Sequence, residues 1–339
     1  MRVIVIGSSG FIGSHLMKAL LADGTLADRS GARQRIREIV AIDIAPPSNP
    51  SAHEDARVRS IIGDASDVAV IERAMDGGVD SIFALGATLT CDAEVNFARG
   101  LDVNLQGMLR LLEACRRRAD RPRLIFTSSI AAFGGLLPET VEDDLQLRPQ
   151  TSYGTQKAVN ELLINDYSRR GAIDGRSLRL PVVLVRPGAA GAAISDQIAA
   201  VIREPLSGRD AICPLDGGTL IPIASARAVA RALLTVHDLP AQAFDHTRSM
   251  NLPSISVRID ELVRAVETIA QRRPWHWRVG GISWQHDAAM QTIVGAWPRR
   301  FESARARALG VHGDATLDEI IDNFINDYLP ALPSGPTMP

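Results

Sequence analysis

The clearest chemical pair in this chain is a tyrosine and a lysine at helical spacing. The phenol and the ammonium stand four positions apart in Tyr153-Gly154-Thr155-Gln156-Lys157, and side chains at that spacing share one face of a helix. A tyrosine with a pKa of about 10 acts as a base at neutral pH only when a cation stabilises its phenolate. The spacing therefore predicts proton transfer, with Tyr153 as the base and Lys157 as the group that lowers its pKa.

A pair of serines supplies a hydroxyl for the same chemistry. Ser128 and Ser129 follow a predicted strand at 123–127, and ligands of open α/β sheets bind beyond the carboxyl ends of the strands. A hydroxyl at that point can hydrogen-bond a reacting alcohol or carbonyl and hold it beside the tyrosine. The alternative interpretation of the two serines is an ordinary turn from strand to loop.

A glycine-rich turn near the N-terminus has the composition of a phosphate-binding loop. Gly7, Gly10 and Gly13 lie between a short apolar strand and a helix that begins at Phe11 and Ile12. Glycines there let backbone N–H groups approach a pyrophosphate, which also meets the positive end of the helix dipole. The spacing is G-x-x-G-x-x-G rather than G-x-G-x-x-G, but its place between strand and helix predicts a dinucleotide site.

Two acids that follow later strands suggest contacts with an adenosine. Asp43 ends the second predicted strand, where a carboxylate accepts hydrogen bonds from ribose hydroxyls and repels a 2′-phosphate, so we expect NAD rather than NADP. A turn or cap acid is the alternative. Asp43 follows Gly13 by 30 residues, more than the usual spacing of about 20, which predicts an insertion around 24–35. Asp64 and Ala65 are placed for the adenine edge, and a helix N-cap explains Asp64 almost equally well.

Apolar runs that alternate with amphipathic segments position these residues. Short β-branched runs predict strands at 3–6, 39–44, 58–62, 79–85, 123–127 and 178–185, and helical periodicity predicts helices at 11–21, 66–76, 94–117 and 152–170. Continuous apolar strands that alternate with helices indicate a parallel sheet covered on both faces. We therefore predict an α/β Rossmann fold, a doubly wound parallel sheet.

The pattern changes after residue 188. We expect a helix at 195–203. A strand at 220–223 and a helix at 226–237 are expected to return to the first domain. A helix at 258–269 and a last helix after the capping box Thr316-x-x-Glu319 follow. These elements predict an NAD-binding domain at 1–187 with 219–250 returning to it, a smaller C-terminal substrate lobe at 188–218 and 251–330, and a frayed tail at 331–339.

Composition excludes several other classes of function. The chain has 339 residues, of which 46% are hydrophobic, and a formal net charge of -2, so it lacks the basic excess of a nucleic-acid surface. No apolar run reaches the roughly 18 residues that a membrane span requires. Three widely spaced cysteines favour a reducing cytoplasm over a disulfide framework, and the scattered histidines predict no metal site.

Taken in order along the whole chain, these motifs resemble the extended branch of the short-chain dehydrogenase/reductase superfamily. The match also includes Leu85-Gly86-Ala87, Asn104 and the stretch 180–187. The resemblance implies a bound NAD that is lined by Leu85, Ala87, Asn104 and Val183, with Lys157 on the nicotinamide ribose.

The same resemblance distinguishes the two serines. In that superfamily the substrate serine lies five residues before the glycine of a motif like Ala131-Ala132-Phe133-Gly134. This rule implies Ser129 rather than Ser128. The resemblance also suggests a homodimer that forms through the helices at 94–117 and 152–170.

The C-terminal half departs from the nucleotide-sugar enzymes of that superfamily. Where they carry an Asn-x-Tyr-Gly-Pro stretch this chain has 183–188, and where they carry an acidic Val-x-Asp-Asp motif it has 223–227. The chain instead resembles the D-erythronate dehydrogenase group, at Ile202-Arg203-Glu204-Pro205-Leu206, Trp297-Pro298 and 301–306. That resemblance implies oxidation of the C2 hydroxyl of a four-carbon sugar acid with NAD.

A sugar acid needs a cation for its carboxylate, preferably the bidentate fork of an arginine. Arg179, Arg186 and Arg227 are the candidates, and a surface ion pair explains each of them equally well. In the expected reaction, the substrate hydroxyl lies between Ser129 and Tyr153, and Tyr153 removes its proton.

Two other functions stay open at this point. The first is a nucleotide-sugar 4-epimerase or dehydratase that keeps and regenerates a tightly bound NAD. The second is a non-catalytic NAD-binding sensor, because a fold alone does not determine function. Net NADH formation with a four-carbon sugar acid would exclude the epimerase, and loss of a measured turnover in Tyr153→Phe would exclude the sensor.

Overall fold

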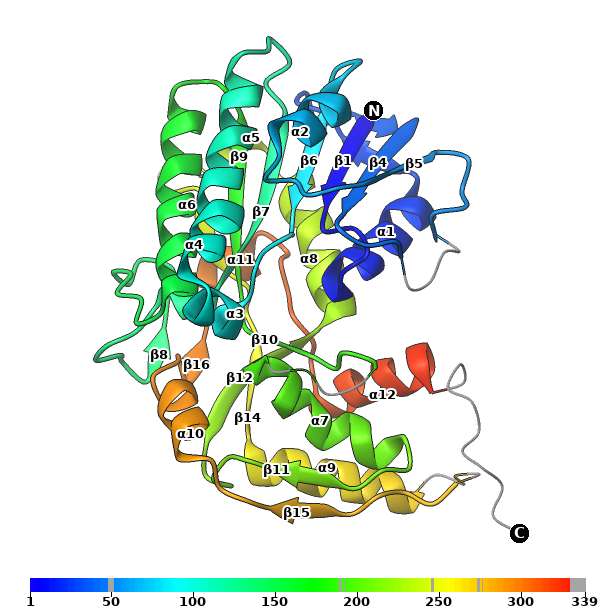
Figure 1. Cartoon of the computed structure of the whole chain (residues 1–339), viewed down its shortest axis with the longest axis vertical. Coiled ribbons are helices and arrows are strands. Elements are labelled where there is room, and N and C mark those ends of the chain that lie inside the picture. The colour runs from blue at the N-terminus through cyan, green and yellow to red at the C-terminus, as the bar shows by residue number, and fades with distance from the viewer. Residues whose placement is uncertain are drawn as a thin grey trace.

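The molecule consists of two lobes, a larger α/β lobe above and a smaller lobe below in Figure 1. The computed structural model describes residues 1–47, 52–188, 191, 193–244, 247–272, 275 and 277–329. The predicted tail at 331–339 lies outside these residues, as do His246 and His276. Within the described ranges, no helix is long and apolar enough to cross a membrane.

Among the described residues, the larger lobe is built on a seven-stranded parallel sheet. The strands lie in the order β13 (Ser249–Asn251), β9 (Asp174–Leu180), β7 (Arg123–Ser129), β6 (Ser81–Ala84), β1 (Arg2–Ile6), β4 (Glu38–Asp43) and β5 (Val58–Ile62). The chain starts in the middle and moves outward on one side and then on the other, so the order reverses between β1 and β6. Ligands bind at such a switch point, and the predicted doubly wound fold is confirmed.

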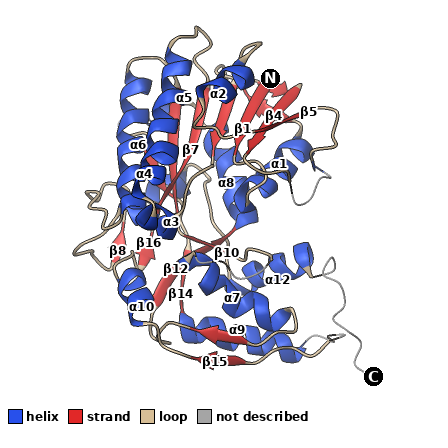
Figure 2. Cartoon of the chain, viewed as in Figure 1, coloured by secondary structure: helices blue, strands red, loops and turns tan. Residues whose placement is uncertain are grey.

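Helices cover both faces of this sheet (Figure 2). One face carries α1 (Phe11–Asp23) and α8 (Ala226–Asp238), and the other carries α2 (Val68–Met75), α5 (Gly107–Arg116) and α6 (Ser152–Arg169). Val3 and Val5 of β1 pack with α1 and α8, whereas Ile4 and Ile6 pack with α2, α5 and α6. A strand buried on both faces is a continuous apolar run, which is why the sequence pattern located it.

The helix predicted at 94–117 is interrupted. It consists of α3 (Thr90–Val95), α4 (Phe97–Gly100), a π-helical segment η2 (Leu101–Gln106) and α5. The break falls at Asn96, whose backbone leaves the helical region and whose side chain accepts a hydrogen bond from the Arg99 N–H at 3.0 Å. Asparagine starts helices well because its side chain satisfies a free N–H of the first turn, so a new helix begins there.

The strand predicted at 178–185 is divided between two sheets. β9 ends at Leu180 in the main sheet, and after Pro181 the chain forms β10 (Val182–Leu184), which pairs with β12 (Leu220–Ser225) in a second sheet. The strand predicted at 220–223 therefore does not return to the main sheet; from that region only α8 and β13 do. Proline has no N–H for a sheet ladder, but the apolar run around it hid the boundary.

The smaller lobe has its own core between helices and short sheets. It contains β10, β12, β14 (Ile255–Arg258), α7 (Ile194–Leu206), α9 (Ile259–Arg272), α10 (Ala288–Gly295), α12 (Leu317–Tyr328) and the pair β11 (Ala211–Cys213) with β15 (Ile282–Trp284). The segment β8 (Thr140–Val141) pairs with β16 (Arg300–Phe301), and α11 (Ala304–Ala308) packs back on the larger lobe. Of the predicted capping box, the Thr316 half forms, since Thr316 accepts from the Glu319 N–H at 3.1 Å, while the Glu319 carboxylate accepts from the Ala315 N–H at 2.9 Å instead of from Thr316.

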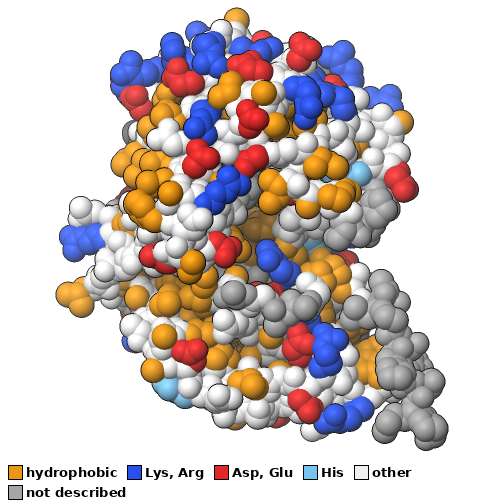
Figure 3. Space-filling model, in the orientation of Figure 1, with side chains coloured by type: hydrophobic (Ala, Val, Ile, Leu, Met, Phe, Trp, Pro, Cys, Tyr) orange, Lys and Arg blue, Asp and Glu red, His pale blue; other side chains and the backbone are white. Residues whose placement is uncertain are grey.

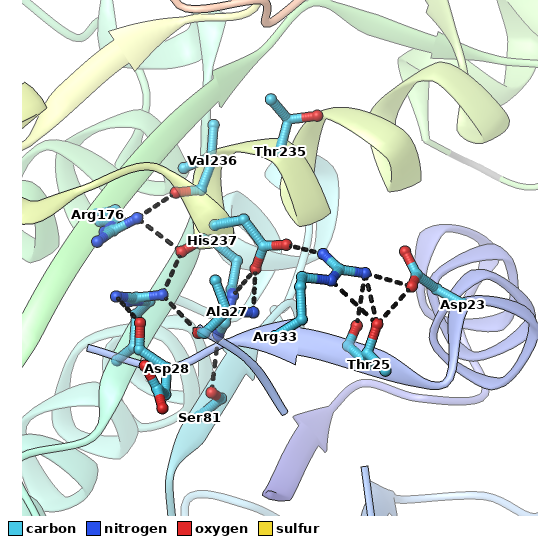
Figure 4. A network of polar contacts seen from close by, with 12 residues as sticks. Asp23, Thr25, Ala27, Asp28, Arg33, Ser81, Arg176, Thr235, Val236 and His237 are labelled. Carbon is cyan, nitrogen blue, oxygen red and sulfur yellow. Dashed lines mark hydrogen bonds and ion pairs between the residues drawn. The ribbon is translucent and has the colours of Figure 1, made fainter. Parts of the chain in front are cut away.

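The insertion predicted at 24–35 is a β-hairpin, β2 (Thr25–Ala27) with β3 (Arg33–Arg35). A polar network ties it to the end of α8 (Figure 4). Arg33 forms ion pairs with Asp23 and Asp238, and the Ala27 N–H donates to Asp238 at 2.9 Å. The hairpin is thus fixed to a helix more than 200 residues away.

Buried His237 is the centre of this network. Its Nε2 lies 2.7 Å from Ser81 Oγ and its Nδ1 lies 2.7 Å from Asp238 Oδ1. The carboxylate requires Nδ1 to carry the proton, so Nε2 accepts from the serine. Both Ser81 and His237 are fully buried. Because no substrate can reach this serine and histidine, their role is structural. Arg176 donates to the His237 carbonyl at 2.7 Å and so satisfies the end of α8.

The network predicts that stability falls in mild acid. Burial lowers the pKa of His237 to about 4, against about 6.5 in an unfolded chain. Between these values the unfolded state binds more protons, so the free energy of unfolding decreases by about 3 kcal/mol as pH falls through this window. In urea titrations from pH 7.5 to about pH 4, His237→Gln should show a shallower decrease than wild type, and His286→Gln, at an exposed site, should not. An unchanged slope in His237→Gln would contradict this assignment.

Candidate active site

A cavity of about 430 Å³ lies between the two lobes, at the switch point of the main sheet. The space-filling view shows the molecule hollowed there (Figure 3). The predicted site residues that line it are Gly7, Gly10, Phe11, Ile12, Gly13, Asp43, Asp64, Ala65, Leu85, Ala87, Asn104, Ser129, Tyr153, Lys157, Val183 and Arg186. Residues that are far apart in the sequence thus meet in one cleft, because the carboxyl ends of parallel strands share one edge of the sheet.

Two glycines of the glycine loop, Gly7 and Gly13, have no room for a side chain. Gly7 has φ +83°, and a Cβ on it would lie 2.7 Å from the Gly86 N. A Cβ on Gly13 would lie 1.9 Å from the Gly7 carbonyl oxygen. α1 begins after Gly10 without a side-chain cap, so the first turn keeps N–H groups for an anion. This close-packed turn in front of an open helix N-terminus fits a pyrophosphate.

Asp43 stands where the loop meets the second strand of the sheet. Its Oδ2 accepts a hydrogen bond from the Ser9 N–H at 2.9 Å, so the carboxylate also closes the glycine turn. The side chain is half-buried and lines the cavity beside Ile44. The turn-holding and ribose-binding interpretations of Asp43 are therefore compatible, since a carboxylate has lone pairs for both.

Asp64 holds the turn before α2. Its Oδ1 accepts from the N–H and the hydroxyl of Ser66 at 2.8 and 2.7 Å, and its Oδ2 pairs with Arg99 at 2.6 Å. The N-cap of α2 is Asp67 instead. Asp64 and Ala65 both line the cavity. The ion pair with Asp64 also places the Arg99 guanidinium at the cavity wall, beside the turn before α2.

The Asn104 side chain connects the loop after β6 to helix α6. Its Oδ1 accepts from the Thr88 N–H at 2.8 Å, and its Nδ2 donates to the Thr88 carbonyl at 2.9 Å and to Gln156 Oε1 at 2.7 Å. Both N–H donors of the amide and one acceptor position of its oxygen are therefore used by the protein. Asn104 shapes the cavity by fixing the strand-to-helix loop that carries Leu85 and Ala87.

The two serines of β7 have different partners. Ser129 lies beside the Tyr153 phenol, whose pKa its hydroxyl lowers, and its Oγ accepts from the Ala131 N–H at 3.1 Å. Ser128 donates to Glu161 in the buried interior. Successive side chains of a strand point to opposite sides, so only one of the pair can meet the tyrosine, and it is Ser129.

Tyr153 lies in the first turn of α6, which Thr151 caps by accepting from the Gly154 N–H at 3.0 Å. A Cβ on Gly154 would lie 1.9 Å from the Ala131 carbonyl oxygen, so this glycine lets the helix approach the Ser129 loop closely. Burial raises the pKa of Tyr153 to about 12, and the hydrogen bond with Ser129 partly opposes that rise. The surrounding protein groups thus keep the phenol protonated. Additional positive charge beside the phenol is needed to favour the phenolate.

Lys157 lies below the tyrosine and is 3% exposed. Its Nζ donates to the Thr127 carbonyl at 2.7 Å and lies 5.4 Å from the centre of the Tyr153 ring. Burial lowers the pKa of Lys157 to about 7, and the charge of Glu161 opposes that decrease. A lysine that is close to its titration point at neutral pH can exchange a proton readily.

Arg179 is a structural residue, which corrects its prediction as a substrate contact. Its guanidinium pairs with Glu161 at 2.8 Å, donates to the Asp143 carbonyl at 2.8 Å and lies 4.9 Å from the centre of the Phe133 ring. It is 5% exposed and does not line the cavity. The next residue of β9, Leu180, lines the cavity, but the Arg179 side chain points to the other side of the strand.

Arg227 is also not a cavity residue, and Arg186 is. Arg227, in the first turn of α8, forms an ion pair with Asp327 of α12 and so links the two lobes. Arg186 is exposed and lines the cavity, with its guanidinium carbon 5.9 Å from the centre of the Phe11 ring. In the described part of the chain no carboxylate pairs with the Arg186 side chain. The structure therefore separates three candidates that the sequence left equal.

Several cavity residues were missed by the sequence reasoning. Thr88, Thr90, Ser195, Asp196 and Trp297 line the cleft from the β6 loop and the smaller lobe. Trp297 belonged to a recognised motif, but its position had no assigned role. Asp196 could not be recognised as a cavity residue from the sequence, because acidic residues are common in the first turn of a helix. Within the described residues, no cluster of three or more histidine, cysteine or acidic side chains could hold a metal ion.

Comparison with known proteins agrees with this architecture. The chain is 41% identical over 327 residues to D-erythronate dehydrogenase of Cupriavidus necator, covering 96% of this chain and 98% of that protein. It is 33% identical to D-erythronate dehydrogenase of Haemophilus influenzae over 96% of this chain and 99% of that protein. The crystal structure of a nucleoside-diphosphate-sugar epimerase from Agrobacterium tumefaciens superposes with a TM-score of 0.87 at 32% identity, covering 98% of this chain and 95% of that chain.

A family model describes the same residues that form the site. It matches residues 3–252, a range that contains the glycine loop, Asp43, Ser129, Tyr153, Lys157 and the main sheet. The predicted resemblance to extended short-chain dehydrogenases is thereby confirmed. The chain belongs to the NAD dependent epimerase/dehydratase family.

Proposed function

We propose that this chain is an NAD-dependent dehydrogenase that oxidises the C2 hydroxyl of a small sugar acid, with D-erythronate as substrate and 2-oxo-tetronate as product. The observation that carries the proposal is that Ser129, Tyr153 and buried Lys157 line the same cavity as the exposed cation Arg186. Two relatives aligned over nearly the whole chain are named D-erythronate dehydrogenases, and this similarity supports the choice of substrate.

The glycine loop, Asp43 and Lys157 would hold the dinucleotide. The loop supplies space and N–H groups for the pyrophosphate, and the Asp43 carboxylate favours a free ribose over a 2′-phosphate, which supports NAD rather than NADP. When bound, NAD supplies the hydride acceptor and a positively charged nicotinamide.

Tyr153 is the proposed base. The phenolate takes the proton of the C2 hydroxyl at its Oη, while the Ser129 hydroxyl holds the same substrate oxygen. Lys157 supplies the protein's own positive charge below the ring, which lowers the energy of the phenolate relative to the phenol. These three residues thus orient the alcohol and remove its proton.

Arg186 is the proposed carboxylate contact. A guanidinium offers two parallel N–H donors that match a carboxylate, and the other two candidate arginines already hold Glu161 and Asp327. Because Arg186 lines the cavity from the loop between β10 and α7, it can hold the acid end of the substrate while Tyr153 contacts the hydroxyl end.

The direct test is to follow NADH absorbance with purified protein, NAD and D-erythronate. We expect continuous NADH formation and much weaker activity with NADP. The control substrate is erythritol, which lacks the carboxylate and should be a poor substrate. No net NADH with any four-carbon sugar acid, together with interconversion of nucleotide sugars, would replace this proposal by the epimerase alternative, the activity for which the similar Agrobacterium protein is named.

We also propose that two copies assemble through α3, α4 and α6. Val95, Phe97 and Leu162 on these helices are 89%, 57% and 69% exposed, and α3 and α4 pack against α6. A second copy would remove these side chains from water. Sedimentation equilibrium should give twice the chain mass, and Leu162→Glu should shift it to one chain. The cytoplasmic location predicted from the cysteines stays a prediction that cell fractionation can check.

A further inference from the structure

A buried ion pair lies beneath the proposed carboxylate site, in helix α7 of the smaller lobe (Figure 1). Arg203 Nη1 donates to Asp196 Oδ1 at 2.9 Å, and the two side chains are 1% and 3% exposed. The other Asp196 oxygen accepts from the Gly191 N–H. Asp196 also lines the cavity, whereas Arg203 does not.

Arg203 also reaches the residue that faces the substrate. The same Nη1 donates to the backbone carbonyl of Arg186 at 2.8 Å. The buried Arg203 guanidinium therefore fastens the Arg186 backbone to α7, and Asp196 fastens the same loop at Gly191. Removing that donor would release the Arg186 backbone and leave its carbonyl without this bond.

The pair also determines the charge that a substrate meets. Asp196 stands on the cavity wall with Arg186, and an uncompensated carboxylate there would repel a carboxylate ligand. Arg203 cancels the Asp196 charge from the protein side. Arg186 then remains as the cation without a carboxylate partner on this part of the wall, among the described residues.

A buried ion pair contributes little net free energy to the stability of a helix, because both charges lose their hydration. Arg203 Nη2 is buried without a hydrogen-bond partner in the described residues, and an apolar pair of similar volume is commonly as stable as a buried ion pair. Packing alone therefore gives no reason for these two charges. Their contacts with the Arg186 loop and the cavity wall do.

We propose that Arg203 and Asp196 are positioning residues that determine how Arg186 binds the substrate carboxylate. This inference rests on the proposed sugar-acid dehydrogenase function. Arg203 holds the Arg186 backbone in place and neutralises Asp196, so it acts on substrate binding both through Arg186 and through the charge of the cavity wall. It takes no part in proton transfer or in NAD binding.

A mutant cycle with Arg186→Ala, Asp196→Asn and Arg203→Met tests the proposal on the full chain. In the wild-type background Arg203→Met should raise KM for D-erythronate at least about tenfold and change kcat less than about threefold, with the same Kd for NAD. In a background that carries both Arg186→Ala and Asp196→Asn the same substitution should change KM less than about twofold, because both the Arg186 side chain and the Asp196 charge through which Arg203 acts are gone. Arg203→Lys should recover part of the affinity.

Matched variants separate positioning from general damage. Arg203 Nε also pairs with Glu204 at 2.8 Å, and exposed Arg209 pairs with the other oxygen of that carboxylate at 2.5 Å. Arg209→Met therefore removes a second partner of Glu204 and should leave KM unchanged. The neutral pair Asp196→Asn with Arg203→Met leaves no buried unpaired charge, so it keeps the cycle measurable if Arg203→Met fails to fold. Its KM should lie between those of wild type and Arg203→Met.

Two results would overturn the proposal, and they differ from each other. Equal KM increases in both backgrounds, or parallel losses of kcat, NAD affinity and thermal stability, would show a structural role only, while the dehydrogenase function would stand. A wild-type protein that oxidises no sugar acid would overturn the proposed function, and this inference with it.

Discussion

Replacing Tyr153 with phenylalanine should lower kcat for D-erythronate oxidation about 1,000-fold and leave the affinity for NAD within about twofold. General-base catalysis commonly contributes a factor of about 100 to 10,000, and the phenol oxygen of Tyr153 is the proposed proton acceptor. Phenylalanine keeps the ring and removes only that oxygen. Steady-state NADH formation gives kcat, and quenching of protein fluorescence by NAD gives the affinity.

Tyr167→Phe is the matched control for this experiment. Tyr167 belongs to the same helix, and its hydroxyl donates to Glu113, outside the cavity lining. This variant should keep wild-type kcat. If Tyr153→Phe keeps full turnover, Tyr153 is not the base. Loss of turnover in Tyr153→Phe, from a wild type that turns over, would exclude the non-catalytic sensor.

Replacing Gly13 with alanine should weaken NAD binding at least about 100-fold, equivalent to about 3 kcal/mol. The new Cβ would lie 1.9 Å from the Gly7 carbonyl oxygen and 2.9 Å from the Gly7 carbonyl carbon, which are backbone atoms that cannot rotate away. The glycine turn must therefore move, and the N–H groups that meet the pyrophosphate move with it. Isothermal titration with NAD measures the loss.

Gly295→Ala is the control for Gly13→Ala. Gly295 ends α10, and a Cβ there would meet no atom within 4 Å. It should bind NAD as wild type does and should be equally stable. Wild-type NAD affinity in Gly13→Ala would show that the dinucleotide does not lie on this turn, and would remove the basis of the cofactor assignment.

The sequence predicted those parts of the site that lie within one stretch of chain. The glycine loop, the Tyr153–Lys157 spacing and the alternation of strands and helices are local patterns, and the fold class inferred from them is confirmed by the sheet. Parallel strands then place the loop, Asp43 and Ser129 at one edge without further information. The structure departs from the predicted element boundaries at Asn96 and Pro181. In both segments the apolar pattern continues across the break, so the sequence did not reveal it.

The tyrosine and lysine were recognisable from four-residue spacing alone, but their electrostatics were not. Burial is a property of the whole lobe, and it raises the pKa of Tyr153 and lowers the pKa of Lys157. The sequence suggested only the attraction between phenolate and ammonium. Desolvation, which opposes the charged form of both groups, required knowledge of what covers them.

The role of each arginine was decided by tertiary structure. Arg179, Arg186 and Arg227 were equivalent as residue types, and their partners Glu161 and Asp327 come from other elements of the fold. A guanidinium binds whichever carboxylate the packing brings within reach, and only the fold leaves Arg186 facing the cavity. The sequence by itself thus determined the reaction chemistry and its dinucleotide cradle, while long-range packing decided which cation is left for the substrate.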